Sequence, residues 1–166
     1  VLAGLPYGEN LLPNGDFSSG IASWSTYSTD SGQLSILSKD ESLQIDVASV
    51  GSNSWDRQVY YEGIAYNQGN RYTLTFKAKA TAARGMNVSI GWLDSANNYT
   101  WHSYTSKVID LTTDEQIYTI EFNVDSDSTT IGRISFELGN IDGGASSNQS
   151  VYIDDINLVN NGVIPE

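Results

Sequence analysis

The feature that most constrains the fold of this chain is a two-residue alternation of apolar and polar side chains. In residues 71–80, Tyr72, Leu74, Phe76 and Ala78 alternate with arginine, threonine and lysine. Successive side chains of a β-strand point to opposite faces, so this run predicts a strand with one buried and one solvated face. Further segments of strand length and similar character are residues 32–37, 42–48, 57–63, 86–93, 106–111, 117–124, 132–139 and 150–159.

These segments predict an all-β protein built as a sandwich of two antiparallel sheets. They are rich in β-branched and aromatic residues and are bounded by Gly, Asn, Asp or Ser. No stretch carries the apolar stripe of an amphipathic helix, and many short strands at this spacing indicate a sandwich. A chain of 166 residues can form one domain with its own core. We expect the domain to span residues 10–160, with residues 1–9 and 161–166 as linker remnants.

One predicted strand breaks the alternation. In residues 151–159 the apolar set Val151 and Ile153 changes phase to Ile156 and Leu158, with two aspartates between them. An extra residue in one strand is the mark of a β-bulge, which redirects the neighbouring side chains. We therefore expect a bulge at Asp154–Asp155.

The charge of the chain excludes two classes of partner. It has 20 acidic and 8 basic residues, a formal net charge of −12. Nucleic-acid phosphates and anionic membranes would be repelled, and no apolar run approaches the roughly 20 residues that span a bilayer. Ten tyrosines and four tryptophans, with only 17% charged residues, are typical of secreted proteins that handle polysaccharides.

Six stretches, taken in order, resemble the carbohydrate-binding modules of family 4 and of the related families 9, 16 and 22. They are NLLPNGDFSSGIASW (10–24), WDRQV (55–59), YNQGNRYTLTFKAKA (66–80), RGMNVSI (84–90), ISFELG (134–139) and VYIDDINLV (151–159). The likeness covers about residues 10–160. It implies a jelly-roll β-sandwich that binds a single polysaccharide chain in a groove across one sheet.

The resemblance also implies what such a domain does and where it works. It implies a non-catalytic, secreted module that binds single chains of a β-glucan, either cellulose-type β-1,4-linked, mixed-linkage or β-1,3-linked. Such a module targets a covalently attached glycoside hydrolase to polysaccharide. A xylan- or mannan-binding module, a glycan-active enzyme domain and an adhesive cell-surface β-sandwich are the alternatives.

Strand parity and the resemblance together select the residues of the groove. A glycan needs aromatic rings against its apolar faces and hydrogen-bonding side chains between them. With Val59 pointing inward, outward-facing positions of three strands supply most of these groups, and aromatic residues near strand ends supply the rest. The expected carbohydrate-binding residues are Tyr27, Trp55, Gln58, Tyr60, Glu62, Asn87, Ser89, Tyr99, Trp101, Arg133 and Glu137. Trp24 and Trp92 are expected in the core, and Arg133 and Glu137 could instead pair with each other.

A structural calcium ion is a further expectation, which the resemblance places away from the groove. Calcium takes carboxylate and carbonyl oxygens from separate segments. The candidate ligands are Asp16, Glu41, the carbonyl of Lys39, and Asp154 at the phase change.

Catalysis has few candidates in this sequence. There is no cysteine, one histidine (His102, expected in a loop or at a strand edge) and no nucleophile elbow. A glycosidase would need two carboxyl groups flanking the bond, and Glu62 with Glu137 or Asp154 with Asp155 are the available pairs. Charged residues on strands are usually solvated, so we expect no catalytic residue.

Overall fold

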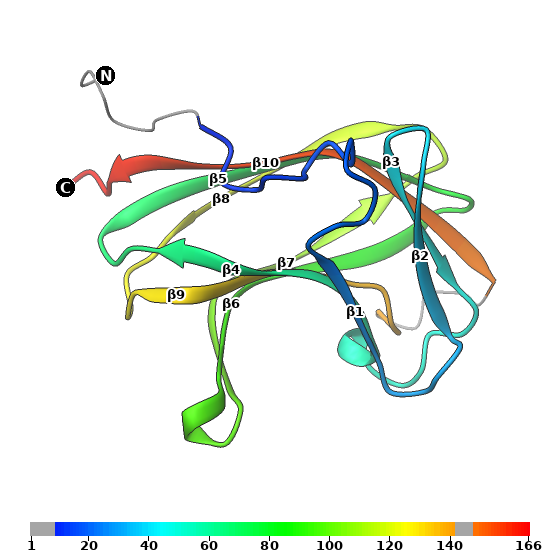
Figure 1. Ribbon diagram of the computed structural model, residues 1–166, viewed down its shortest axis with the longest axis horizontal. Helices are drawn as coiled ribbons and strands as arrows, with labels where there is room; N and C mark the ends of the chain where they lie inside the picture. Colours follow the sequence, from blue (N-terminus) through cyan, green and yellow to red (C-terminus); the bar gives the residue numbers. More distant parts are fainter. Residues whose placement is uncertain (1–8, 142–147) are drawn as a thin grey trace.

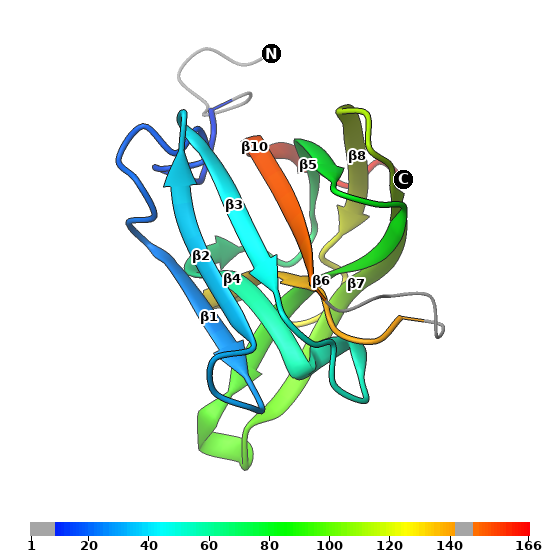
Figure 2. The ribbon, with the colours of Figure 1, turned by 90° about the vertical axis from the view of Figure 1, so that its right-hand side faces the viewer.

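The computed structural model describes residues 9–141 and 148–166, which form two five-stranded sheets lying face to face (Figures 1 and 2). The first sheet has the order β1 (Trp24–Ser28), β4 (Arg57–Tyr66), β9 (Thr129–Glu137), β6 (Arg84–Asp94), β7 (Thr100–Leu111). The second has the order β2 (Leu34–Lys39), β3 (Ser42–Val47), β10 (Gln149–Val163), β5 (Asn70–Ala80), β8 (Gln116–Asn123). All these pairings are antiparallel, so the predicted β-sandwich is confirmed.

The core lies between the sheets and is built from the inward-facing residues that the alternation predicts. On β9, Ile134 and Phe136 are fully buried, and Leu74 and Phe76 of β5 face them from the second sheet. Trp24 is buried too, as expected: its ring packs against Phe136, and its indole nitrogen donates to a main-chain carbonyl. A continuous apolar layer of this kind is the main source of stability for a chain without disulfides.

The phase change in the last strand is a bulge, as predicted. Asp154 pairs with Lys77 and Asn157 with Thr75, so β10 carries an extra residue between these pairs. Asp155 takes a positive φ of 49° at this point. The shift lets the apolar residues on both sides of the bulge reach the core, and Val151, Ile153, Ile156 and Leu158 are all completely buried.

Most strand boundaries differ from the sequence prediction by one to three residues, and three differences are larger or add a strand. β1 was not expected, because only its first residue is buried and the segment shows no alternation. β7 begins at Thr100 rather than at residue 106 and includes His102. β10 continues to Val163, so half of the expected linker 161–166 belongs to a strand. Residues 1–8 of the other expected linker lie outside the described part of the chain.

Helical structure in the described residues consists of two short 3₁₀ turns, at opposite ends of the first sheet. η1 (Ser54–Asp56) leads directly into β4. η2 (Ser95–Asn97) joins β6 to β7 at the tip of a hairpin that projects beyond the sheet (Figure 1). No helix in the described ranges is long and apolar enough to cross a membrane.

Candidate functional site

The outer face of the first sheet carries its side chains in rows that cross all five strands. Residues paired between neighbouring antiparallel strands point to the same face. One row runs Tyr27, Gln58, Glu137, Asn87, Val108, and the next runs Ser25, Tyr60, Ser135, Ser89, Ser106. Four inter-strand steps of about 4.8 Å make each row roughly 19 Å long. Because the second row is mostly serine, short side chains leave the middle of this face low and open.

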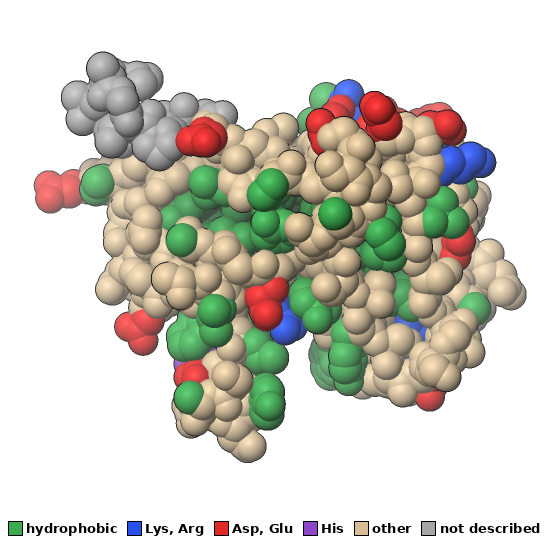
Figure 3. Space-filling model, viewed as in Figure 1, with side chains coloured by type: hydrophobic (Ala, Val, Ile, Leu, Met, Phe, Trp, Pro, Cys, Tyr) green, Lys and Arg blue, Asp and Glu red, His purple; other side chains and the backbone are tan. Residues whose placement is uncertain are grey.

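Two walls at opposite ends of the strands turn this floor into a groove of about 1070 Å³. The first wall, here called the η1 wall, consists of residues 52–55 with Asn140 and Ile141. The second wall is the β6–β7 arm (residues 92–102), which lines the groove with Leu93, Tyr99 and Trp101. Figure 3 shows the hollow between the two projections, with hydrophobic side chains on both of its sides.

Aromatic rings line the groove without being buried in the core. Trp55 on the η1 wall is 54% exposed, Tyr99 on the arm is 68% exposed, and Tyr27 at the β1 edge is 49% exposed. Trp101 is half-buried beside them. Large exposed apolar groups gathered in one hollow are uncommon on a monomer and indicate a contact surface. Rings of this kind stack on flat apolar ligand faces while polar groups between them fix the orientation.

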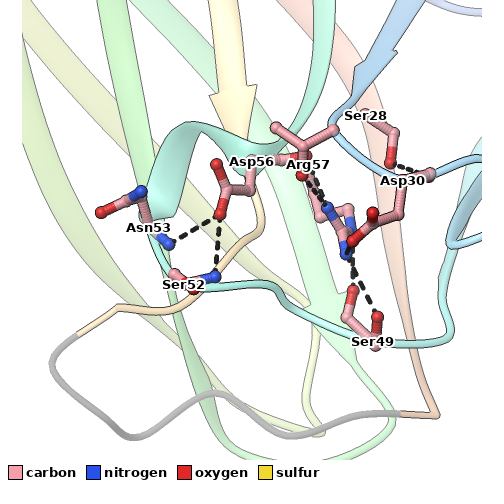
Figure 4. Close-up of polar contacts among 8 residues, drawn as sticks. Ser28, Asp30, Ser49, Ser52, Asn53, Asp56 and Arg57 are labelled. Atoms are coloured by element: carbon pink, nitrogen blue, oxygen red, sulfur yellow. Dashed lines mark hydrogen bonds and ion pairs between the residues drawn. The ribbon is translucent and has the colours of Figure 1, made fainter.

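The η1 wall is held by a buried arginine. Arg57, the first residue of β4, has no exposed surface. Its guanidinium donates to the carbonyl oxygens of Ser49 (2.7 Å) and Asp56 (2.8 Å) and to the hydroxyls of Ser49 (3.1 Å) and Thr29 (2.9 Å). Asp30 lies 3.5 Å from the same group (Figure 4). Arg57 therefore fixes the backbone on both sides of the turn that carries Trp55.

Asp56 holds the same turn from within. Its Oδ2 accepts hydrogen bonds from the main-chain N–H groups of Ser52 (2.8 Å) and Asn53 (2.9 Å), as Figure 4 shows. The bond from Asn53 is the largest cause of a lowered pKa of Asp56, because it favours the ionised carboxylate. The side chain of Gln58 donates to the carbonyl oxygen of Trp55 (2.8 Å), which ties the turn to the groove floor.

A chain of hydrogen bonds crosses the groove floor. The hydroxyl of Ser54 and the amide of Asn87 both donate to Oε1 of Glu137, at 3.0 and 2.8 Å. Ser106 donates in turn to the carbonyl oxygen of the Asn87 amide (3.1 Å). These contacts join η1, β9, β6 and β7, so the polar side chains of the floor are oriented before any ligand arrives. Such pre-organisation lowers the entropy cost of binding.

Arg133 does not pair with Glu137, although the sequence left that pairing open. Its guanidinium is ion-paired with Glu62 on the neighbouring strand and lies over the ring of Tyr60, 4.2 Å from its centroid. Glu62 and Arg133 are direct cross-strand partners, which explains this choice. One consequence is that Arg133 covers a face of Tyr60, so this ring is less free to stack on a ligand than Trp55 or Tyr99.

The arm carries a stacked pair of rings, Trp92 and His102, and the sequence prediction placed Trp92 wrongly. Trp92 was expected in the core because it shares the parity of Val88 and Ile90, but it is only half-buried. β6 continues past the region that the second sheet covers, and Trp92 instead stacks on His102 with ring centroids 4.3 Å apart. Nε2 of His102 lies 3.3 Å from Oδ2 of Asp94, so the histidine is part of the arm.

The structure brings ten of the eleven expected binding residues to the groove. The exception is Glu62, which does not line the groove but forms an ion pair with Arg133, which does. The groove residues that were not expected are Ser52, Asn53, Ser54, Leu93, Ser103, Ser106, Val108, Ser135, Asn140 and Ile141. Ser135 shares the outward parity of Arg133 and Glu137 and could have been found that way. The loop residues carry no periodic signal, because their positions depend on η1 and on the chain after β9.

The four expected calcium ligands do not form one compact cluster of side chains. Lys39 and Asp154 line a small cavity of about 420 Å³ on the second sheet, whereas the carboxylate of Asp16 accepts hydrogen bonds from Ser18. Glu41 lies in the β2–β3 turn, outside that cavity. In residues 9–141 and 148–166, no three His, Asp or Glu side chains are placed to hold a metal. An ion here would need main-chain carbonyl oxygens as additional ligands.

Comparison with known proteins gives the family. Residues 9–150 match the carbohydrate binding domain of families 4 and 9. This match covers most of the chain, so the chain belongs to that family of carbohydrate-binding modules, which are non-catalytic. A solved CBM4 structure has 27% sequence identity and a TM-score of 0.75, over 89% of this chain and 98% of that one.

Two more distant relatives come from one bacterium. Endoglucanase C of Cellulomonas fimi is 25% identical over 130 residues, which are 78% of this chain and 11% of the enzyme. This chain therefore spans only about a tenth of that relative. The N-terminal cellulose-binding domain of β-1,4-glucanase C from the same organism has the same fold, with a TM-score of 0.64 and 22% identity over 98% of this chain and 99% of that one.

Proposed function

We propose that this module binds single chains of a β-glucan in the groove of the first sheet. The observation that carries the proposal is the pairing of exposed aromatic residues on two opposed walls with an oriented polar floor between them. A β-linked glucan has flat apolar ring faces and equatorial hydroxyls at its edges. Stacking on Trp55, Trp101, Tyr99 and Tyr27 suits the faces, and the amide and hydroxyl groups of the floor suit the edges.

The groove is open at both sides of the sheet, which favours an extended chain over a small sugar. Tyr27 and Val108 end one row of the floor and are both about half exposed. A ligand longer than the row can therefore continue beyond either edge strand. The cellulose-type β-1,4-glucan is our first candidate, with mixed-linkage and β-1,3-glucans next.

We further propose that the module targets a linked glycoside hydrolase to its polymer outside the cell. The support is the relationship to endoglucanase C of Cellulomonas fimi, of which this chain matches a small part. A xylan- or mannan-binding module is the second candidate. A xylan-binding domain from Paenibacillus barcinonensis shares the fold, with a TM-score of 0.58 at 8% identity.

Affinity electrophoresis with soluble polymers tests the proposed function. The protein is run in separate gels that contain β-1,4-glucan, mixed-linkage glucan, β-1,3-glucan, xylan or mannan. At least one of the three glucan gels should retard it. The double variant Trp55→Ala/Trp101→Ala should migrate freely, whereas Tyr152→Ala, an aromatic change on the second sheet, should be retarded like the wild type. Retardation only by xylan or mannan would select the second candidate. Release of reducing sugar by the isolated module would contradict a non-catalytic role.

A structural calcium ion near Lys39 and Asp154 is part of the proposal. The support is the environment of Asp154: burial, with the nearby carboxylates of Asp155 and Glu115, raises the pKa of its carboxyl group, and a bound cation would offset this cost of ionisation. Excess EDTA should then lower the melting temperature of wild type by several degrees, and Asp154→Asn should remove that response. A melting curve that EDTA does not change would contradict a bound calcium ion.

A further inference from the structure

The charge of the groove comes from very few groups. Among the described residues that line it, Arg133 and Glu137 are the charged ones. Arg133 is neutralised by its ion pair with Glu62, which stands just outside the lining. The balance is one negative charge, carried by Glu137.

Glu137 occupies the centre of the floor. It lies on β9, the middle strand of the first sheet, in the same row as Gln58 and Asn87. Its side chain is held by the hydrogen bonds from Ser54 and Asn87, and only 9% of the residue is exposed. Two donors on one oxygen suit an ionised carboxylate, which only accepts hydrogen bonds. Water screens a charge in such a position less than a charge on the open surface.

We propose that Glu137 is a specificity-determining residue that makes the groove select uncharged glycans over glycans bearing carboxylate groups. A chain lying across the floor passes directly over the middle strand, so a carboxylate substituent near it meets a fixed negative charge at short range. Hydroxyl groups at the same position can donate to the carboxylate and are favoured. This inference rests on the proposed function, because it concerns the same groove.

The net charge of −12 acts in the same direction, so the experiment must separate one groove charge from the surface charge. A matched pair of polymers does part of this: hydroxyethyl cellulose and carboxymethyl cellulose share a β-1,4-glucan backbone and differ mainly in substituent charge. The measured quantity is the dissociation constant for carboxymethyl cellulose divided by that for hydroxyethyl cellulose, both at low ionic strength. Wild type should bind the hydroxyethyl polymer more tightly.

The Glu137→Gln variant should reduce this ratio about tenfold, which corresponds to about 1.4 kcal/mol. Glutamine keeps an acceptor for Ser54 and Asn87, so the geometry of the floor is retained. The control is Glu121→Gln, which removes one negative charge from an exposed position on β8 of the second sheet. A second variant, Glu62→Gln, frees the charge of Arg133 and should reduce the ratio as well.

Each outcome has a separate meaning. A reduced ratio in Glu137→Gln and Glu62→Gln, with no change in Glu121→Gln, supports the inference. Equal ratios in wild type and Glu137→Gln, or an equal reduction in Glu121→Gln, would overturn it and leave glucan binding intact. A wild-type protein that binds no neutral β-glucan would instead overturn the proposed function.

Discussion

The two walls of the groove are built in different ways. The η1 wall is held by the buried guanidinium of Arg57 and by the carboxylate of Asp56, which together fix the backbone around Trp55. The β6–β7 arm has no buried charge; the Trp92–His102 stack and the His102–Asp94 contact join its two strands. Its tip carries two consecutive non-glycine residues with positive φ, Asn98 at 57° and Tyr99 at 56°.

This difference shows how one groove can combine a pre-organised wall with an adjustable one. Hydrogen bonds fix the backbone that carries Trp55, which lowers the entropy cost of ordering this wall around a ligand. The arm is exposed and locally stabilised, so Tyr99 and Trp101 can move to follow ligands of different shape. Changes in Arg57 and Asp56, which hold the η1 wall, should therefore cost stability, whereas changes in the residues that hold the arm should cost mainly affinity.

The largest expected effect is on stability and concerns Arg57. Arg57→Met would remove the side-chain donor to the carbonyl oxygen and the hydroxyl of Ser49, and one of the two donors to the carbonyl oxygen of Asp56, which also accepts from the main-chain N–H of Thr29. Polar groups that lose hydrogen bonds in a largely buried position are costly. Because a buried side chain that makes several hydrogen bonds is replaced by one that makes none, we expect the free energy of unfolding to fall by about 3 kcal/mol. Chemical denaturation measures it. Arg71→Met, at an exposed position of β5, should change it by less than about 0.5 kcal/mol. Equal losses in the two variants would break the comparison between the walls.

The next effect is on binding and concerns the two tryptophans. Trp55→Ala and Trp101→Ala should each weaken β-glucan binding by about 2 kcal/mol, as the loss of an aromatic anchor does. Neither variant should unfold the domain, because neither ring belongs to the core. Isothermal titration calorimetry measures the affinities. If both variants keep full affinity for every β-glucan that wild type binds, the assignment of the groove is wrong.

A smaller effect should separate the arm from the rest of the domain. Trp92→Ala removes the ring that stacks on His102, an aromatic contact that stabilises by about 1 kcal/mol. We expect affinity for the glucan to fall by up to about fivefold while the unfolding midpoint changes little. An unfolding midpoint lowered as much as in Arg57→Met would show that the arm is an integral part of the core.

The smallest effect is a dependence on pH. The pKa of Asp56 is lowered in the folded state, so its ionised form contributes stability above the ordinary value of 3.8 and this contribution is lost as the pH falls through the lowered value. Wild type should therefore lose more unfolding free energy below that pH than Asp56→Asn does. If the unfolding free energies of the two proteins fall in parallel as the pH is lowered, the carboxylate of Asp56 does not hold the η1 wall.

Strand parity allowed much of this architecture to be predicted. It placed Ile134 and Phe136 in the core, and it located the bulge beside Asp154, because a period of two is visible in the sequence itself. It failed for Trp92, since parity gives the face of a strand and not whether another sheet covers that face. The partner of Arg133 was not predictable either, because it depends on the register between β9 and β4.

The most direct test of the groove is to map where a glucan touches the protein. Backbone amide chemical shifts, recorded while a β-1,4-linked glucose hexamer is titrated into the wild-type module, report on every strand at once. Our account predicts shifts along β4, β9, β6 and the two walls, centred on the row that contains Gln58, Glu137 and Asn87. Saturable shifts confined to the second sheet, around Tyr152 and Lys79, would contradict it.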